Sequence, residues 1–436
     1  MSRSNAHQGA TSAATGAVGL AATGSPVGGA SRIPIFDGVR GFAALSLLTV
    51  HIAFIGGVLG FYDQPPSNKV AAMAISSLQL TIGVFFLLTG LFLYRPFARA
   101  IITGGRGPVI RHYLLRRALR LLPAYWVMVV AALLLLNFNS IDSLWYVLRP
   151  ILLLQNYDHV PMAGLDVSWT VPTEMQVYLA LPIIAAVSGW YARRSPDPVV
   201  RANRLMVPVV LLIVIGLVWM TYIHLPHMGI FPAQYWWPIG MAGNVGIGMA
   251  LGILSARRQA LPDRPPALFV AAGRHPNLFW FGALVMIFLH SLRLFAPAGY
   301  GDYATVGNAI ATYLLVMAAS GLIILPMVSV TRETPLMRVL LGNRPIVYIG
   351  RISYGVYLWH FFAINLYMSN GSIFGADPVL FHFLRGQVGF LELWVATIVI
   401  TIAIATVSYY VLERPILRFS ERYVKGRSAK LPEVRA

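Results

Sequence analysis

Long apolar segments alternate with short polar connections along most of the chain, and this alternation predicts a bundle of membrane-spanning helices. A helix needs about 20 mainly apolar residues to cross the hydrocarbon core of a bilayer. We expect ten spans, at about 41–60, 77–95, 118–136, 170–188, 207–225, 236–254, 277–295, 308–329, 346–367 and 391–412. The predicted fold class is therefore all-α, a polytopic membrane helix bundle with about 10 transmembrane helices.

One further apolar run, Leu144–Leu154, is too short to span and is interrupted by Arg149 and Pro150. A run of this kind favours a re-entrant or interfacial helix. No convincing repeat relates the two halves of the chain, which speaks against the inverted-repeat architecture of many transporters.

Composition and charge agree with the membrane prediction. Hydrophobic residues make up 57% of the chain and charged residues 11%, whereas soluble domains carry about 25% charged residues. The net charge of +18 would suggest nucleic acid in a soluble protein, but here the basic residues fall in short connections on one side. Of the 33 Lys and Arg residues, those on the other side are Lys69, Arg149, Arg293 and Arg385. The positive-inside rule then places both termini in the cytoplasm, and we predict no nucleic-acid partner.

The same pattern divides the chain into three parts. Residues 1–32 are rich in Ala, Gly, Ser and Thr without a compact apolar signal region, so we expect a disordered cytoplasmic tail. Residues 33–417 form the predicted transmembrane domain, and 418–436 form a basic cytoplasmic tail. The absence of cysteine excludes disulfides, thiolate metal sites and a cysteine nucleophile, and we predict no metal site.

Candidate chemistry begins in the first span. Ionisable residues inside spans are costly and mark functional sites by default. Arg40 and His51 are eleven positions apart, which is three helical turns to within about 20°, so their side chains share one face. The rise of 1.5 Å per residue separates them by roughly 16 Å. One face therefore carries a cation at the membrane edge and a titratable base near the middle.

A buried carboxylate in the fourth span is the second candidate. Glu174 and Tyr178 are one turn apart near the outer end of that span. Because His51 lies in the outer half of the first span, we expect the two at comparable depth. A His51–Glu174 pair would set the imidazole tautomer and make His51 a general base. The alternative for His51 is a structural histidine bonded to a neighbouring carbonyl.

Arginines at the cytoplasmic mouth of the third span form another candidate site. Arg117 and Arg120 are neighbours at i, i+3, a geometry suited to phosphate. The equally weighted alternative is a topology signal in contact with lipid headgroups.

A polar stripe runs down the ninth span. Ser353, Tyr357 and His360 share a face at i, i+4 and i+7, and His360 taken alone is read as structural. The segment Glu413–Pro415 follows the tenth span and is read as a helix cap and interface anchor.

At these residues the chain resembles the acyltransferase-3 family of integral-membrane O-acyltransferases, of the type without a fused extracytoplasmic hydrolase-like domain. The most specific element is the Arg40 and His51 pair, preceded by the run Phe36–Gly41. It is supported by Phe85–Gly90, Arg117 with Arg120, Trp169–Glu174, Ser353–His360 and Glu413–Pro415. Thr89 stands where the family often has serine, a change that keeps the hydroxyl. The sequence ends without a hydrolase-like domain, so a second transfer step would need another protein.

The resemblance implies transfer of an acyl group, often acetyl, from cytoplasmic acyl-CoA to a hydroxyl of an envelope carbohydrate or glycolipid. Acyl-CoA is then a co-substrate and no cofactor stays bound. The implied donor-binding residues are Arg40, Arg117 and Arg120; the implied catalytic residues are His51 as base with Glu174 orienting it; and the implied pocket residues are Asp37, Trp169, Tyr357 and His360. We expect a multi-pass protein of the plasma or inner membrane, with the bilayer, the acceptor and other envelope-assembly proteins as partners.

Several alternatives stay open from the sequence. Buried His and Glu residues also form proton relays, so a transporter or flippase for an organic anion or lipid-linked sugar is the main rival, and a structural scaffold is a third reading. Direct transfer and a Ser or His acyl relay both fit the residues. The connections 137–168 and 367–392 are expected to select the acceptor, through residues such as Asn156, Asp158, His159 and Asp166.

Overall fold

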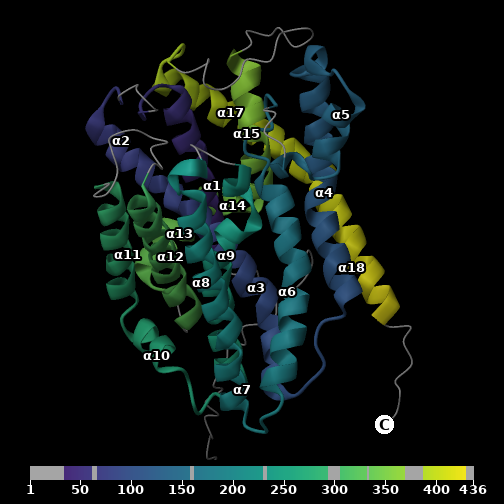
Figure 1. Cartoon of the computed structure of the whole chain (residues 1–436), viewed down its shortest axis with the longest axis vertical. Coiled ribbons are helices and arrows are strands. Elements are labelled where there is room, and N and C mark those ends of the chain that lie inside the picture. Colours follow the sequence, from purple (N-terminus) through teal and green to yellow (C-terminus); the bar gives the residue numbers. More distant parts are fainter. Residues whose placement is uncertain are drawn as a thin grey trace, which may run out of the picture.

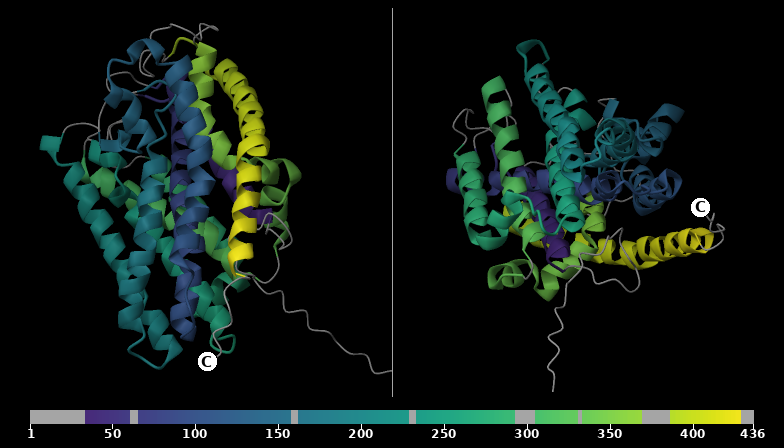
Figure 2. Two further views of the ribbon diagram at one scale, coloured as in Figure 1. Left: turned by 90° about the vertical axis from the view of Figure 1, so that its right-hand side faces the viewer. Right: turned by 90° about the horizontal axis from the view of Figure 1, so that it is seen from below.

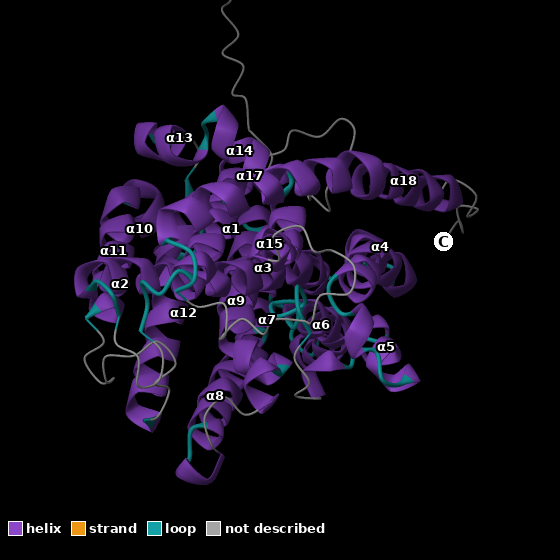
Figure 3. Ribbon diagram, turned by 90° about the horizontal axis from the view of Figure 1, so that it is seen from above, coloured by secondary structure: helices purple, strands orange, loops and turns teal. Residues whose placement is uncertain are grey.

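The computed structural model describes residues 34–60, 66–157, 162–228, 233–292, 305–330, 333–368 and 386–428, and in these ranges the regular structure is helical without strands (Figures 1 and 3). The predicted N-terminal tail lies outside the described residues. The main helices are α1 (Pro34–Ile55), α2 (Lys69–Ser76), α3 (Thr81–Thr103), α4 (Ile110–Leu135), α5 (Leu144–Ile151), α6 (Thr170–Ala192), α7 (Pro198–Arg204), α8 (Met206–Ile223), α9 (Ala242–Ala260), α10 (Ala267–Arg274), α11 (Pro276–Ser291), α12 (Val306–Ser329), α13 (Pro335–Leu341), α14 (Arg344–Arg351), α15 (Ser353–Met368), α17 (Phe390–Ser408) and α18 (Arg414–Ser428).

The predicted membrane bundle is confirmed. Within the described ranges, 8 helical stretches are long and apolar enough to cross a membrane. Two predicted spans are shorter than expected. The segment expected at 277–295 is the 16-residue α11, and the one expected at 346–367 is broken at Ile352 into α14 and α15. Backbone bonds from Ile352 to Tyr348 and from Val356 to Ile352 continue across the break, so α14 and α15 follow one another closely.

The C-terminal helix is longer than the sequence pattern suggested. A π-helical turn, Tyr409–Glu413, joins α17 to α18, and the three segments form one extended rod that passes α4 (Figure 2). Residues 418–428, predicted as part of the basic tail, continue α18. The run Leu144–Leu154 contains the eight-residue α5, as expected of an apolar stretch too short to span.

Helix α1 lies at the centre of the bundle, where it contacts α3, α13, α14, α15 and α17. Glycine makes these contacts close. A Cβ atom on Gly38 would overlap the carbonyl of Leu341 in α13, and one on Gly350 would overlap the carbonyl of Asp37. Small residues let membrane helices approach at backbone distance, which here fixes the part of α1 that carries Arg40.

The arginine-rich connections that follow α3, α6 and α9 lie at one end of the bundle, the end that holds α7 and α10 in Figure 1. Arg193 donates to the carbonyl of Gly105 (3.4 Å), and Arg201 donates to that of Ile102 (3.3 Å). Arg258 donates to the carbonyl of Ser329. Connections distant in the sequence are therefore tied together by the residues that the positive-inside rule assigned to one side.

Candidate active site

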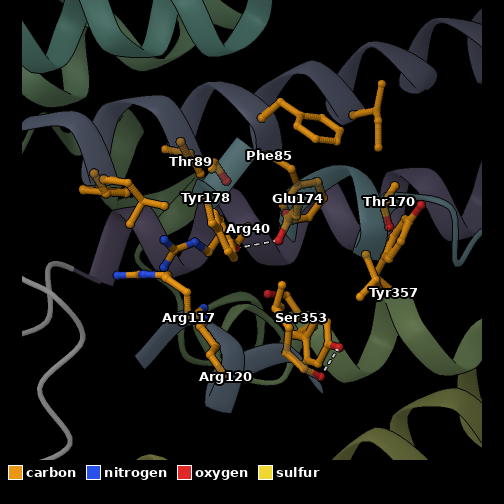
Figure 4. A pocket seen from close by; sticks show the side chains of 18 residues that line it. Arg40, Phe85, Thr89, Arg117, Arg120, Thr170, Glu174, Tyr178, Ser353 and Tyr357 are labelled. Carbon is orange, nitrogen blue, oxygen red and sulfur yellow. Dashed lines mark hydrogen bonds between the residues drawn. The ribbon is translucent and has the colours of Figure 1, made fainter. Parts of the chain in front are cut away.

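A pocket of about 840 Å³, including the space open to solvent at its mouth, lies between α1, α3, α4, α6 and α15. Its polar and charged lining comes from all five helices: Arg40, Thr89, Arg117, Arg120, Thr170, Glu174, Tyr178, Ser353, Tyr354 and Tyr357. Figure 4 shows the three arginines at one end, Thr170 and Tyr357 at the other, and Glu174 between them. The pocket thus joins motifs that lie more than 300 positions apart in the chain.

The cationic end of the pocket is built from α1 and α4. Arg40 lies 3.7 Å from Asp37, measured from Nη1 to Oδ1, and its guanidinium lies 5.4 Å from the ring centroid of Phe92. The guanidinium of Arg117 lies 6.0 Å from the ring centroid of Tyr178. Both arginines thus lie beside an aromatic ring and line the pocket together with Arg120. Clustered arginines of this kind suit a polyphosphate, because each can donate two parallel hydrogen bonds.

Glu174 belongs to this cationic end and does not pair with His51. Its Oε2 accepts a hydrogen bond from the hydroxyl of Tyr178 (2.7 Å), and its carboxylate interacts electrostatically with the three arginines. The predicted His51–Glu174 pair is therefore wrong. A carboxylate at the level of Arg40 is about three turns of α1, roughly 16 Å, away from His51.

The depth of α6 explains this correction. The sequence pattern places Glu174 near the outer end of the fourth span, on the assumption that α6 begins at the outer surface. The segment before it is instead buried, with Met162, Leu165 and Val167 each exposed by 6% or less. Because buried chain covers the start of α6, Thr170 already lies inside the bundle and Glu174 reaches the level of Arg40.

The partner of His51 is His360. Nδ1 of His51 lies 2.9 Å from Nε2 of His360, and Nδ1 of His360 lies 2.6 Å from the carbonyl oxygen of Tyr357. A carbonyl only accepts, so Nδ1 of His360 carries a proton and, in a neutral ring, Nε2 accepts. Nδ1 of His51 must then donate, which leaves the lone pair on its Nε2. No described residue bonds to this Nε2. The chain of bonds therefore fixes His51 in the tautomer of a base.

The histidine pair lies beyond the far end of the pocket. Neither ring lines the pocket, but Tyr357 does, and its ring centroid is 5.6 Å from that of His360. The hydroxyl of Tyr357 donates to the carbonyl of Val167 (3.2 Å). Helix α15 thus connects the pocket, the buried segment before α6 and the histidine pair.

Two predicted pocket residues lie beside the pocket. Asp37 acts on it through Arg40, as its ion-pair partner. Trp169 stacks on Phe86, a lining residue, with ring centroids 6.4 Å apart.

Glu413 is a residue whose position the sequence did not reveal. Its side chain is 8% exposed, accepts a hydrogen bond from Ser408 (3.4 Å), and interacts electrostatically with Arg120. The sequence favours a helix cap at Glu413–Pro415, whereas the structure places Glu413 in a π-helical turn, from which its carboxylate interacts with Arg120. Because π turns shift side chains off the 3.6-residue period, a sequence pattern does not predict this contact.

Comparison with known proteins identifies the family of the chain. The model of a family described as an acyltransferase domain matches residues 33–412, so the chain belongs to the acyltransferase-3 family. It is 24% identical over 404 residues to "Putative peptidoglycan O-acetyltransferase YrhL" of Bacillus subtilis, covering 88% of this chain and 55% of that protein. It is 23% identical over 410 residues to "Peptidoglycan O-acetyltransferase OatA" of Listeria monocytogenes, covering 88% and 56%. The chain thus spans about half the length of these relatives. No solved structure matches it.

Proposed function

We propose that this chain is a membrane O-acetyltransferase that moves an acetyl group from cytoplasmic acetyl-CoA to a hydroxyl of a cell-envelope glycan. The observation that carries the proposal is the arrangement along α1. A cluster of three arginines lies at one level of this helix, and a histidine fixed as a base lies about three turns further on. Family membership favours an acyltransferase over the transporter and the scaffold.

The arginine end is proposed as the seat of the donor. Coenzyme A carries several phosphates, and Arg40, Arg117 and Arg120 supply charge-assisted hydrogen bonds to such groups. The carboxylate of Glu174 offsets part of their mutual repulsion when the donor is absent. From there the thioester arm extends through the pocket toward Tyr357. The roughly 16 Å between Arg40 and His51 suits an extended pantetheine arm.

His51 is proposed as the general base. Its Nε2 takes the proton of the acceptor hydroxyl while the hydroxyl oxygen forms a bond to the thioester carbonyl carbon. The carbon–sulfur bond then breaks, the electron pair leaves with sulfur, and the imidazolium of His51 returns the proton to the thiolate. The products are the O-acetyl ester and free coenzyme A. His360 orients the ring throughout, because its Nε2 accepts from Nδ1 of His51.

The names of the relatives supply the proposed acceptor class. Both are named as peptidoglycan O-acetyltransferases, one of them as putative, so a hydroxyl of peptidoglycan or of a related envelope glycan is the proposed acceptor. Direct transfer is the simpler route, because the lone pair of His51 is available for it.

A reconstituted transfer assay tests the proposal. The full chain in proteoliposomes would receive acetyl-CoA labelled in the acetyl group, together with oligosaccharides that a muramidase releases from peptidoglycan. We expect label in the oligosaccharide, in an ester that mild alkali removes, together with release of free coenzyme A. Uptake of unchanged acetyl-CoA or oligosaccharide into the vesicles without ester formation would favour a transporter and contradict the proposal.

A further inference from the structure

A cluster of aromatic side chains adjoins the pocket on the side of Trp169. Trp169 and Trp236 have ring centroids 4.8 Å apart, and Tyr157 and Trp237 have centroids 5.4 Å apart. We call Tyr157, Trp169, Trp236 and Trp237 the aromatic platform. These residues come from the segments that precede α6 and α9, far from the arginine-rich connections in Figure 1.

The platform is continuous with the pocket at one end and reaches the surface at the other. Trp169 stacks on Phe86 with an interplanar angle of 18°, and Phe86 lines the pocket, as does Thr170 beside Trp169 in the chain. At the other end, 47% of Tyr157 is exposed. Partly exposed rings therefore lead from the surface to the end of the pocket where Thr170 and Tyr357 lie.

A buried amide ties together the two backbone segments that carry Trp169 and Trp236. The Nδ2 of Asn156 donates to the carbonyl of Trp169 (2.9 Å) and to that of Trp236 (3.3 Å). The hydroxyl of Thr173 also donates to the carbonyl of Trp236 (2.8 Å). Asn156 is only 4% exposed, and its Oδ1 has no hydrogen-bond partner among the residues that the structure describes. A tryptophan that only seats a protein at the membrane interface needs no such fixation, whereas a preorganised binding surface does.

We propose that the aromatic platform binds sugar rings of the glycan acceptor and directs a hydroxyl toward the far end of the pocket. This inference rests on the proposed function. A pyranose ring has an apolar C–H face that lies flat on an aromatic ring, and hydroxyl edges that need hydrogen bonds. Trp and Tyr offer large rigid surfaces at low entropic cost. Gln176, which accepts from the hydroxyl of Tyr157 (2.9 Å), lies where a sugar edge would need polar groups.

The position of the platform also separates the two substrates. The donor is proposed to enter at the arginine end, and the platform approaches the pocket from the Thr170 end. Loss of a platform ring is therefore expected to weaken binding of the acceptor and to leave binding of the donor unchanged.

Two variants and one control test this inference in the full chain. Trp236→Ala removes a central ring of the platform. Tyr157→Ala removes an exposed ring, so this substitution leaves no cavity in the core. Phe281→Ala is the control, because Phe281 of α11 is 62% exposed and makes no ring contact with the residues that the structure describes. We expect each platform variant to raise the KM for muramidase-released oligosaccharide about tenfold, the loss of about 1.4 kcal/mol of binding, with the KM for acetyl-CoA unchanged. The control should keep both values.

Titration of the oligosaccharide into the protein without donor separates this inference from the proposed function. Calorimetry should show binding to the wild type and to Phe281→Ala, and about tenfold weaker binding to both platform variants. This result supports the platform even if the wild type transfers no acetyl group, in which case only the proposed function fails. Equal affinity for wild type and platform variants, equal losses in Phe281→Ala, or no binding to the wild type would each overturn the inference.

Discussion

Nδ1 of His51 lies 2.9 Å from Nε2 of His360, and the two imidazole rings are nearly parallel, at 14°. The residue that orients the proposed base is thus a second histidine and not a carboxylate. Because Nδ1 of His360 donates to the carbonyl of Tyr357, Nε2 of His360 accepts and Nδ1 of His51 donates. A neutral partner orients His51 without placing a negative charge beside it.

Variants of His360 test this orienting role. His360→Ala should lower kcat about 100-fold, because His51 loses the acceptor that sets its tautomer. His360→Gln should keep kcat within about tenfold of the wild type, because its side-chain oxygen can accept from Nδ1 of His51. The KM for acetyl-CoA should stay unchanged in both. Equal losses in the two variants would mean that His360 only fills space.

The donor seat is tested on two neighbouring arginines. Arg117 lines the pocket, whereas Arg116, the next residue of α4, is exposed. Arg117→Ala should weaken binding of acetyl-CoA about 10- to 100-fold, because a charge-assisted hydrogen bond contributes about 1.5–3 kcal/mol. Arg116→Ala should change the Kd less than about threefold. Isothermal titration of acetyl-CoA measures both, and similar losses in the two variants would point to general charge attraction instead of a site.

Close contact between α1 and α14 is tested at a glycine. Gly350→Ala would push a methyl group into the carbonyl of Asp37, whereas a Cβ on Gly307 of α12 meets no atom within 4 Å. We expect Gly350→Ala to destabilise the protein by about 1–3 kcal/mol and Gly307→Ala to have no such effect. Thermal unfolding in detergent distinguishes them. An unchanged melting temperature in Gly350→Ala would contradict the close approach of the two helices.

Asp166, in the segment between α5 and α6, predicts a pH dependence of stability. Burial raises the pKa of its carboxyl from 3.8 to about 7. The folded state therefore keeps a proton that the unfolded state releases, and the stability falls as the pH rises from about 4 to 7 and then levels off. Asp166→Asn lacks this titration, so its melting temperature should fall less between pH 5 and pH 7 than that of the wild type. Parallel curves would show that Asp166 is not the group responsible.

The sequence predicted which residues lie at the site better than it predicted which of them contact one another. Periodicity alone put Arg40 and His51 on one continuous helix, and the i, i+3 spacing of Arg117 and Arg120 brought both to the pocket. Helical periodicity predicts which residues lie on the same face of a helix, but not at which depth in the bundle the helix begins. The depth of Glu174 depends on buried chain before α6, which no helical pattern encodes.

Contacts between helices that are far apart in the chain could also not be predicted from the sequence. From the sequence, His360 taken alone is interpreted as structural, since histidines that hold helices together are common, whereas its partner His51 lies 309 positions away. Glu413 interacts with Arg120 from a π-helical turn, which follows no simple period. The break at Ile352 follows Gly350 and Arg351, and Gly350 lies against the carbonyl of Asp37 in α1, a contact between helices far apart in the sequence.

The central claim is that Nε2 of His51 accepts the proton of the acceptor hydroxyl, and one comparison tests it most directly. Transfer of labelled acetyl from acetyl-CoA to the oligosaccharide is measured for the wild type and His51→Ala in the same proteoliposomes, with the Kd for acetyl-CoA determined on each. We predict a rate at least about 100-fold lower in His51→Ala, with the Kd unchanged. Transfer at the wild-type rate by folded His51→Ala would contradict the account.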